Sequence, residues 1–142
     1  MAKLRHLAIA TDDPDATAQF YVDVFGLWRV RTAQGAAHYG HILTDGTINL
    51  AILRFTTDEA AGVEKGASFV GLHHIGFEVD DVEETARRVA AAGATARHDI
   101  NDALGLDRTK YVKGELKFSG PDDVIFDLSE PGIWQLAPAD TE

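Results

Sequence analysis

Residues 4–13, LRHLAIATDD, recur as residues 72–81, LHHIGFEVDD, with a histidine at the same place in both copies. His6 and His74 are separated by 68 positions, and the paired aspartates that close each stretch keep the same spacing. Duplicated positions become related by symmetry in a folded chain. The repeat therefore predicts that two imidazoles meet at one site, as they do in metal centres.

The composition is that of a chain able to form one compact domain or two small fused modules. It has 142 residues, of which 45% are hydrophobic, and a formal net charge of −10. A field of this sign repels nucleic acid and anionic membranes, so we expect neither as a partner. The absence of cysteine excludes disulfides and thiolate zinc sites and suits a reducing compartment. No apolar run is long enough to span a bilayer, and we expect a soluble, cytoplasmic protein.

The first copy predicts a strand, a helix and three more strands. Residues 3–10 alternate as a strand, and the acidic residues around Pro14 begin a helix over residues 14–25 that ends at Gly26. Further strands are predicted over residues 27–34, 38–44 and 47–54, with a tight turn at Asp45-Gly46. The helix carries an apolar stripe that we expect to pack on the sheet: Ala16, Phe20 and Val24, joined by Tyr21 and Phe25.

The second copy repeats the same order after a linker. Residues 55–70 lack periodicity and allow at most one helical turn. A strand over 72–79, a helix from Asp80 or Asp81 to Ala92 and strands over 94–99, 109–118 and 123–129 follow. We therefore divide the chain into a first module (1–54), a linker (55–70), a second module (71–130) and a C-terminal tail (131–142).

This tandem order resembles the vicinal oxygen chelate family, which includes glyoxalases, extradiol dioxygenases, methylmalonyl-CoA epimerases and the bleomycin and fosfomycin resistance proteins. The resemblance covers about residues 3–130. It is carried by RHLAI around His6, the helix end at residues 20–27, HHIGF around His74 and GPDDVIFDL at residues 120–128. It implies an α+β fold in which two tandem βαβββ modules form curled mixed sheets around a metal and substrate cavity. It also implies a homodimer.

The resemblance also implies a set of metal ligands. In the family, ligands project from the first and last strand of each module, which here correspond to His6, His74, Asn49 and Asp127. We take Asn49 and Asp127 as equivalent positions, although they are 78 residues apart, because the second copy has a longer loop. Two imidazoles and one carboxylate leave coordination positions open for a chelating substrate. They suit a divalent Fe, Mn, Ni, Co or Zn ion.

Two positions depart from the family pattern. Asp127 replaces the commoner glutamate and is one methylene shorter, so the ion must lie nearer the strand or bind through water. Asn49 stands where lactoylglutathione lyase has a glutamate, and an amide cannot accept a proton at neutral pH. This counts against full glyoxalase I chemistry. Asn49 is then a weak fourth ligand or a substrate-binding donor, with a structural hydrogen bond as the alternative.

The remaining histidines are not assigned to the metal. His38 and His41 are expected on opposite faces of one strand, so only one of them could reach the cavity, and we take His41 as the substrate-binding candidate. By the same alternation, His73 is expected to point away from His74 and to lie on the exterior or at an interface. His98 precedes the long loop and belongs to no recognisable pattern.

Further polar residues are candidates for the substrate cavity. Tyr111, Glu115 and Lys117 share one face of the strand predicted over 109–118. In the family this strand often contacts substrate, so we assign Tyr111 and Lys117 to substrate binding and Glu115 to proton transfer. Glu78 lies on the same strand face as His74 and is a second candidate base, with a rim carboxylate bonded to the sheet as the alternative.

Three functions compete. The first is a metal-dependent lyase, isomerase or dioxygenase acting on a small substrate that chelates the ion through vicinal oxygens. The second is a non-catalytic protein that sequesters a small molecule, as in bleomycin resistance, although those relatives usually lack the metal ligands. The third is a thiol transferase of the fosfomycin type. That enzyme needs a cationic environment, for which the nearby candidates are Lys110, Lys113 and Lys117.

Overall fold

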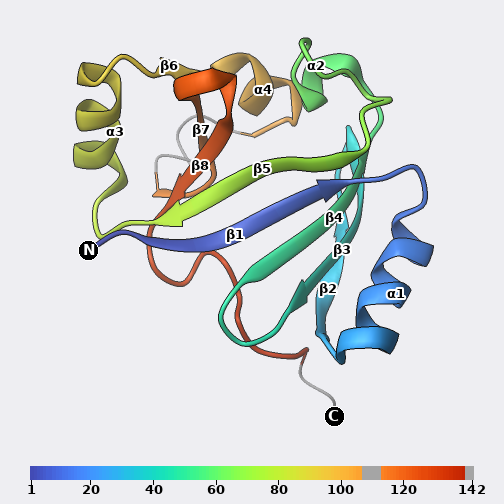
Figure 1. Ribbon diagram of the computed structural model, residues 1–142. Coiled ribbons are helices and arrows are strands. Elements are labelled where there is room, and N and C mark those ends of the chain that lie inside the picture. Colours follow the sequence, from blue (N-terminus) through green and yellow to red (C-terminus); the bar gives the residue numbers. More distant parts are fainter. Residues whose placement is uncertain (107–112, 140–142) are drawn as a thin grey trace.

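The structure is a computed structural model that describes residues 1–106 and 113–139. Its eight strands form one curled mixed sheet in the order β2-β3-β4-β1-β5-β8-β7-β6, which confirms the predicted α+β fold (Figure 1). The strands of the first half are β1 (Lys3–Ala10), β2 (Trp28–Gln34), β3 (His38–Thr44) and β4 (Asn49–Phe55). Those of the second half are β5 (Gly71–Glu78), β6 (Thr95–Ala96), β7 (Leu116–Ser119) and β8 (Ile125–Ser129).

The two halves join through the antiparallel pair β1 and β5. His6 lies opposite Gly76, Leu7 opposite Ile75, and Ala8 opposite His74. The repeat spacing of 68 relates His6 to His74 and Ala8 to Gly76, so it exchanges the first and third pairs. It maps the pair of Leu7 and Ile75 onto itself, so an approximate two-fold axis passes between these two residues. His6 and His74 are therefore diagonal neighbours across the two central strands, within reach of each other.

Each central strand also carries an extra residue. The pairing skips Arg5 between Leu4 and His6, and it skips His73 between Leu72 and His74. These two positions are equivalent in the repeat, so the two strands are bulged symmetrically. A bulge breaks the strict alternation of side chains and turns the local backbone.

Two long helices lie towards opposite ends of the sheet (Figure 1). Helix α1 spans Pro14–Phe25 and α3 spans Val82–Ala91, both close to the predicted ranges. The carboxylates of Asp13 and Asp81 accept backbone N–H groups in the first turn of each helix, which satisfies donors that the helix leaves unpaired. Gly26 ends α1 with a φ of 70°, a conformation that glycine adopts without strain.

The apolar stripe predicted to pack α1 on the sheet is wrong. Phe20, Val24 and Phe25 are 52%, 58% and 65% exposed, whereas Ala18 is fully buried. The small side chain of Ala18 lets the helix approach the sheet closely, and it packs with Leu43 and Ile52. The outward aromatic face leaves an exposed apolar surface of the kind that marks contacts between proteins. The homodimer stays a prediction.

The segment between β5 and β8 departs from its predicted strands. Only Thr95–Ala96 forms β6. Of the strand predicted over 109–118, residues 113–115 are not in a strand and β7 begins at Leu116, while residues 109–112 lie outside the described part of the chain. Directly after β6, α4 (His98–Ala103) buries Ile100 and Asn101 completely, so this stretch packs as a helix and not as an edge strand. The linker contains one short helix, α2 (Asp58–Ala61). Among the described residues, no helix is long and apolar enough to span a membrane.

The C-terminal tail returns to the first half of the sheet. After β8, the chain passes across to the side of β1 and β4 (Figure 1). The backbone N–H of Ala139 donates to the carbonyl of Arg29 at 2.8 Å, and the carbonyl of Gln135 accepts the side-chain amide of Asn49 at 3.1 Å. The tail is therefore packed against the sheet at the position of Asn49.

Arg97 ties the linker to the second half. Its guanidinium donates two bonds to Glu64, at 2.6 and 2.9 Å, two to Asp99, at 3.0 Å each, and one to the hydroxyl of Ser119 at 2.9 Å. The arginine side chain is only 12% exposed. Hydrogen bonds from Arg97 lower the pKa values of Glu64 and Asp99 below their usual range. Both carboxylates therefore stabilise the folded state in their charged form.

We predict that Arg97→Ala lowers the free energy of unfolding by about 1–2 kcal/mol at pH 7. The difference from wild type should shrink as the pH falls through the ordinary carboxyl values of 4.5 and 3.8, because protonated carboxyls no longer bind the arginine. Urea unfolding at several pH values measures both effects. Arg87→Ala is the matched control, since Arg87 makes one exposed pair with Glu83 and should contribute less than about 0.5 kcal/mol. Equal effects of the two substitutions would contradict the assignment.

Candidate metal centre

A cavity of about 100 Å³ lies against the central strands, and it is divided in character. The first half of the chain contributes mainly apolar side chains from β3 and β4, namely Ile42, Ala51, Leu53 and Phe55. The second half contributes the polar side chains Glu115, Lys117 and Asp127, and both His6 and His74 also line the cavity. The site thus has an apolar wall on β3 and β4, whereas its charged side chains are Glu115, Lys117 and Asp127 together with Arg31 of β2.

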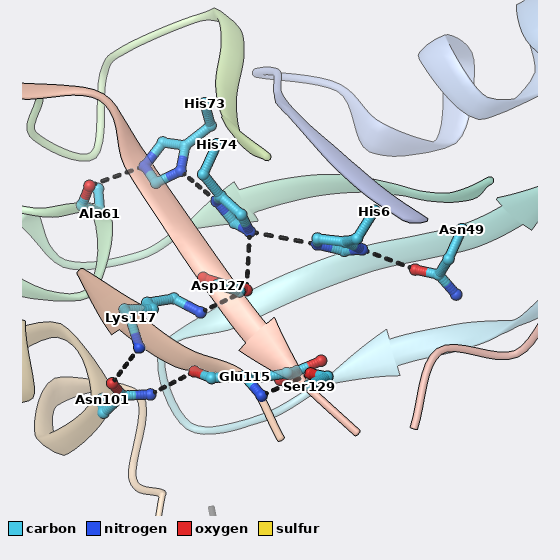
Figure 2. Close-up of polar contacts among 10 residues, drawn as sticks. All are labelled: His6, Asn49, Ala61, His73, His74, Asn101, Glu115, Lys117, Asp127 and Ser129. Carbon is cyan, nitrogen blue, oxygen red and sulfur yellow. Dashed lines mark hydrogen bonds and ion pairs between the residues drawn. The ribbon is translucent and has the colours of Figure 1, made fainter. Parts of the chain in front are cut away.

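Three candidate ligands from three strands converge in this cavity (Figure 2). His6 Nε2 lies 3.2 Å from His74 Nε2, and His74 Nε2 lies 3.4 Å from Asp127 Oδ2. The ligand atoms of all three residues are within 4.8 Å of one another. Bonds of about 2.0–2.2 Å from an ion to N or O ligands place neighbouring ligand atoms about 3.0–3.5 Å apart. The separations of His74 Nε2 from His6 Nε2 and from Asp127 Oδ2 match that requirement.

Hydrogen bonds determine which nitrogen of His74 faces the cavity. The carbonyl of Ala61 can only accept, so His73 Nε2 donates to it at 2.7 Å. A neutral His73 must then accept at Nδ1, and His74 Nδ1 donates to it at 2.7 Å. In neutral His74 the lone pair consequently lies on Nε2, which faces Asp127 and His6 (Figure 2).

A second chain of hydrogen bonds orients His6 in the same way. The amide nitrogen of Asn49 donates to the carbonyl of Gln135 at 3.1 Å, which leaves Asn49 Oδ1 to face His6. His6 Nδ1 donates to that oxygen at 2.8 Å, so the lone pair of neutral His6 is on Nε2. Hydrogen-bonded partners of this kind fix ring orientation and tautomer in metal-binding histidines.

The tail closes the site over His6. The Trp134 ring stacks on the His6 imidazole with centroids 4.9 Å apart and planes 2° from parallel. Trp134 is 5% exposed and leaves no room for a larger residue at Gly76, where an added Cβ would lie 2.6 Å from the indole. This stacking excludes water from one side of the imidazole and restricts its rotation.

The residues present fit a bound cation. With both tautomers set, two imidazole lone pairs and a carboxylate oxygen face one another, and acceptors alone cannot hydrogen-bond together. The second oxygen of Asp127, Oδ1, is buried with no hydrogen-bond partner among the described residues. A cation satisfies all of these acceptors at once, and the donor set of two imidazoles and a carboxylate suits a divalent transition metal.

The protein itself supplies one positive charge at this place. Lys117 Nζ lies 3.0 Å from Asp127 Oδ2, and both side chains are almost completely buried. Burial raises the pKa of Asp127, but the charge of Lys117 and the contact with His74 outweigh it, so that pKa lies below its usual range. Asp127 is therefore an anion in the folded protein, as a ligand must be.

Burial also keeps two of the histidines neutral. It lowers the pKa of His6 to about 3, with His74 acting in the same direction. Burial likewise lowers the pKa of His73 to about 3, again reinforced by His74. Neutral imidazoles are the form in which histidine binds a metal or accepts a hydrogen bond.

The helix α4 positions the polar wall of the cavity. Asn101 donates to the carbonyl of Glu115 at 2.9 Å and accepts the backbone N–H of Lys117 at 3.2 Å. The N–H of Glu115 donates to the Ser129 hydroxyl at 2.7 Å. These bonds hold Glu115 at a φ of 56°, a left-handed conformation that is unfavourable for a residue with a side chain. The strain is maintained where Glu115 lines the cavity.

Two expectations about the strands are wrong. His73 is not exterior: it is 3% exposed and bonded to His74, because the bulge at His73 breaks the alternation on which the expectation was based. Asn49 and Asp127 are not equivalent. Leu7 pairs with Leu50 and Ile75 with Phe126, so the position equivalent to Asp127 is Ala51.

Some of the other predicted site residues line the cavity and others do not. Lys117, Glu115 and Asn49 line the cavity, but His41 and Glu78 are not among its lining residues. His41 Nε2 is bonded to Asp15 of α1 at 2.6 Å, and Glu78 pairs with Arg5 at 3.8 Å. His38, rather than His41, lines the cavity. Tyr111 lies outside the described residues.

Several site residues were missed by sequence reasoning. Trp134 and Gln135 are in the tail, where no periodic pattern indicates a contact with β1 or β4. Asn101 falls in a predicted loop, but the structure buries it in α4, where its side chain bonds to two backbone groups, one just before β7 and one in β7. For the hydrogen bond between His73 and His74, the only signal in the sequence is that the two histidines are adjacent.

Comparison with known proteins agrees with this geometry. Residues 3–128 match the Glyoxalase/Bleomycin resistance protein/Dioxygenase superfamily. Because this match covers most of the chain, the protein belongs to that superfamily. A comparison with curated proteins gives no match.

Solved structures with the same fold include two enzymes. Methylmalonyl-CoA epimerase in complex with methylmalonyl-CoA and NH4+ has a TM-score of 0.67 and 21% identity, over 96% of this chain and 99% of that chain. A mutant of 4-hydroxymandelate synthase from Streptomyces coelicolor has a TM-score of 0.68 and 20% identity, over 96% of this chain but 41% of that chain. A hypothetical protein from Bacillus halodurans has a TM-score of 0.66 and 18% identity, over 99% of both chains.

Burial of His6 and His73 predicts an acid-sensitive fold in the metal-free protein. His6 and His73 have pKa values near 3 in the folded state and take up protons below about 6.5 when unfolded. Stability is therefore complete above pH 6.5 and is lost as the pH falls towards 3. Between pH 7 and pH 5 the loss should be roughly 2–4 kcal/mol in total.

Nitrogen-15 NMR of the imidazoles checks the cause. At pH 5 both rings should give signals of neutral imidazole, with the proton on Nδ1 of His6 and on Nε2 of His73. Imidazolium signals from either residue at that pH would contradict the lowering of their pKa values by burial.

Proposed function

We propose that this protein is a metal-dependent enzyme acting on a small substrate that chelates the ion through vicinal oxygens. The observation that carries the proposal is the convergence of three buried acceptors, His6 Nε2, His74 Nε2 and Asp127 Oδ2. His74 Nε2 lies 3.2 Å from His6 Nε2 and 3.4 Å from Asp127 Oδ2, which are separations that one ion can bridge. When bound, a divalent ion polarises the oxygens of a substrate and stabilises negative charge that develops on them. Three ligands leave positions for two substrate oxygens.

We propose proton transfer as the reaction type, with Glu115 as the base. Glu115 lines the same cavity as the three candidate ligands, and its backbone is held in place by Asn101 and Ser129. A carboxylate in this position can remove a proton from a carbon beside a polarised carbonyl. Glu78 is the weaker candidate, because it lies outside the cavity lining and pairs with Arg5. A lyase or isomerase follows from this arrangement more directly than a dioxygenase does.

The ion pair between Lys117 and Asp127 favours a second candidate, a metal-free binding protein. In that case the ammonium of Lys117 permanently neutralises Asp127, and the cavity holds a small molecule without reacting with it. The two candidates differ in whether the wild-type protein retains a metal.

Metal content of the purified protein tests the main proposal. After reconstitution, we expect wild type to hold about one divalent ion per chain, and His6→Ala, His74→Ala and Asp127→Asn each to lower affinity at least about tenfold. His41→Ala is the matched control, because His41 is bonded to Asp15 away from the cavity. A wild-type protein that is folded but retains no divalent ion after reconstitution would contradict the enzyme proposal and favour the binding protein.

His73 should influence metal affinity without touching the ion. We predict that His73→Phe lowers the affinity about 10–100-fold, because His74 loses the acceptor that fixes its tautomer. His73→Gln should recover part of the affinity, since its amide oxygen can accept from His74 Nδ1. Competition with a chromophoric chelator measures each value. Unchanged affinity in His73→Phe, with the fold intact, would show that the bond to His74 has no effect on the ion.

A further inference from the structure

Lys117 is the only cationic side chain in contact with the three candidate ligands among the described residues. Its Nζ lies 3.0 Å from Asp127 Oδ2, the same oxygen that His74 approaches at 3.4 Å (Figure 2). The lysine is 3% exposed. A buried ammonium beside a carboxylate stabilises the fold only while the pair is intact, since either partner alone is a buried, unpaired charge.

The backbone prevents Lys117 from leaving the cavity by a shift of β7. Its N–H donates to Asn101 Oδ1 at 3.2 Å, and its carbonyl accepts the N–H of Arg97 at 2.8 Å. Arg97 is itself held by Glu64 and Asp99. Any change in the partner of the ammonium must therefore come from rotation of its side chain within the cavity.

The Lys117 ammonium has more N–H donors than it has acceptors among the described residues. It carries three N–H groups, and among the described residues it has one acceptor, Asp127 Oδ2. Lys117 also lines the cavity together with Arg31. A ligand in the cavity that carries oxygen acceptors would therefore meet unpaired donors.

The charges in the cavity define the ligand further. Without a metal, Lys117 pairs with Asp127, and Arg31 and Glu115 add one charge of each sign, so the described charges of the cavity sum to zero. A divalent ion adds two positive charges that no described cavity residue offsets. Uncompensated charge in a buried site is costly, so the metal-bound cavity favours an anionic ligand. The wall formed by Ile42, Ala51 and Leu53 suits an apolar group on the same ligand.

We propose that Lys117 has two successive partners in this site. In the metal-free protein its ammonium takes the place of the ion beside Asp127, and when a divalent ion binds Asp127 the ammonium binds an anionic oxygen of the substrate. The substrate class is a small 2-oxo or 2-hydroxy carboxylate with an apolar substituent. Its vicinal oxygens chelate the ion, and its carboxylate bonds to Lys117. This inference rests on the proposed metal-dependent function.

The test uses the opposite effects expected of Lys117→Met on two ligands. Removing the ammonium removes a competitor for Asp127, so the affinity for Zn2+ should rise about tenfold. The affinity of the Co2+-loaded protein for oxalate, a vicinal dicarboxylate, should fall about tenfold or more because one charged hydrogen bond is lost. Chelator competition measures the first, and titration of the Co2+ visible spectrum measures the second. Lys117→Arg should retain most of the oxalate affinity.

Controls separate this role from a structural one. Metal-free Lys117→Met should melt about 10 °C below wild type, because Asp127 is left unpaired, and the Lys117→Met/Asp127→Asn double variant should recover most of that shift. If the single variant does not fold without metal, it is refolded with excess Zn2+ before the titrations. Lys113→Met removes an exposed lysine four residues earlier and should change neither affinity.

The outcomes distinguish this inference from the function on which it rests. If Zn2+ and oxalate affinities both fall in Lys117→Met, or if neither changes, the two-partner role is wrong while the metal site stands. If wild type binds neither Zn2+ nor Co2+, the proposed function itself fails. A rise in Zn2+ affinity with a fall in oxalate affinity is the result that supports the role.

Discussion

The antiparallel pairing of β1 with β5 is the constraint on which the site depends. It sets His6 opposite Gly76 and His74 opposite Ala8, so that two histidines far apart in the sequence become diagonal neighbours across an approximate two-fold axis. A shift of one residue in this register would turn one imidazole to the other face of the sheet. The small residues opposite each histidine matter as well, because His6 Cβ is only 2.8 Å from where a side chain at Gly76 would begin.

The two copies of the repeat carry different side chains at equivalent positions of the cavity, and these differences determine which groups can bind a metal. Asp127 and its neighbour Lys117 on β7 correspond by strand register to Ala51 and Ile42, so the buried ion pair of the second half has an apolar counterpart in the first. The equivalent bulges diverge in the same way: Arg5 binds the carbonyl of Thr47 and faces Glu78, whereas His73 turns inward and supports His74. Duplication thus explains how two imidazoles meet, and divergence explains why only one carboxylate joins them.

Much of the fold was predictable because its signals are local or repeated. The helix over residues 14–25, the strand over 38–44 and the duplicated histidines all follow from caps, alternation and spacing. The inward turn of His73 was not predictable, because a bulge changes the face of a residue without changing the sequence pattern. The contacts of Trp134 with His6 and of Gln135 with Asn49 depend on the path of the tail, which carries no periodic signal. The strand β6 is short because the chain turns into α4 directly after it, and this helix buries Ile100 and Asn101. Asp127 came from family resemblance, and its position relative to Ala51 required the strand register.

The most direct test of the central claim, that His6, His74 and Asp127 hold one divalent ion, is anomalous X-ray diffraction from crystals grown with Co2+. The claim predicts a single anomalous peak in each chain, about 2.0–2.2 Å from His6 Nε2, His74 Nε2 and an Asp127 carboxylate oxygen. It also predicts that the Lys117 ammonium has moved away from Asp127. An intact pair between Lys117 and Asp127 with no anomalous peak between the two imidazoles would contradict it.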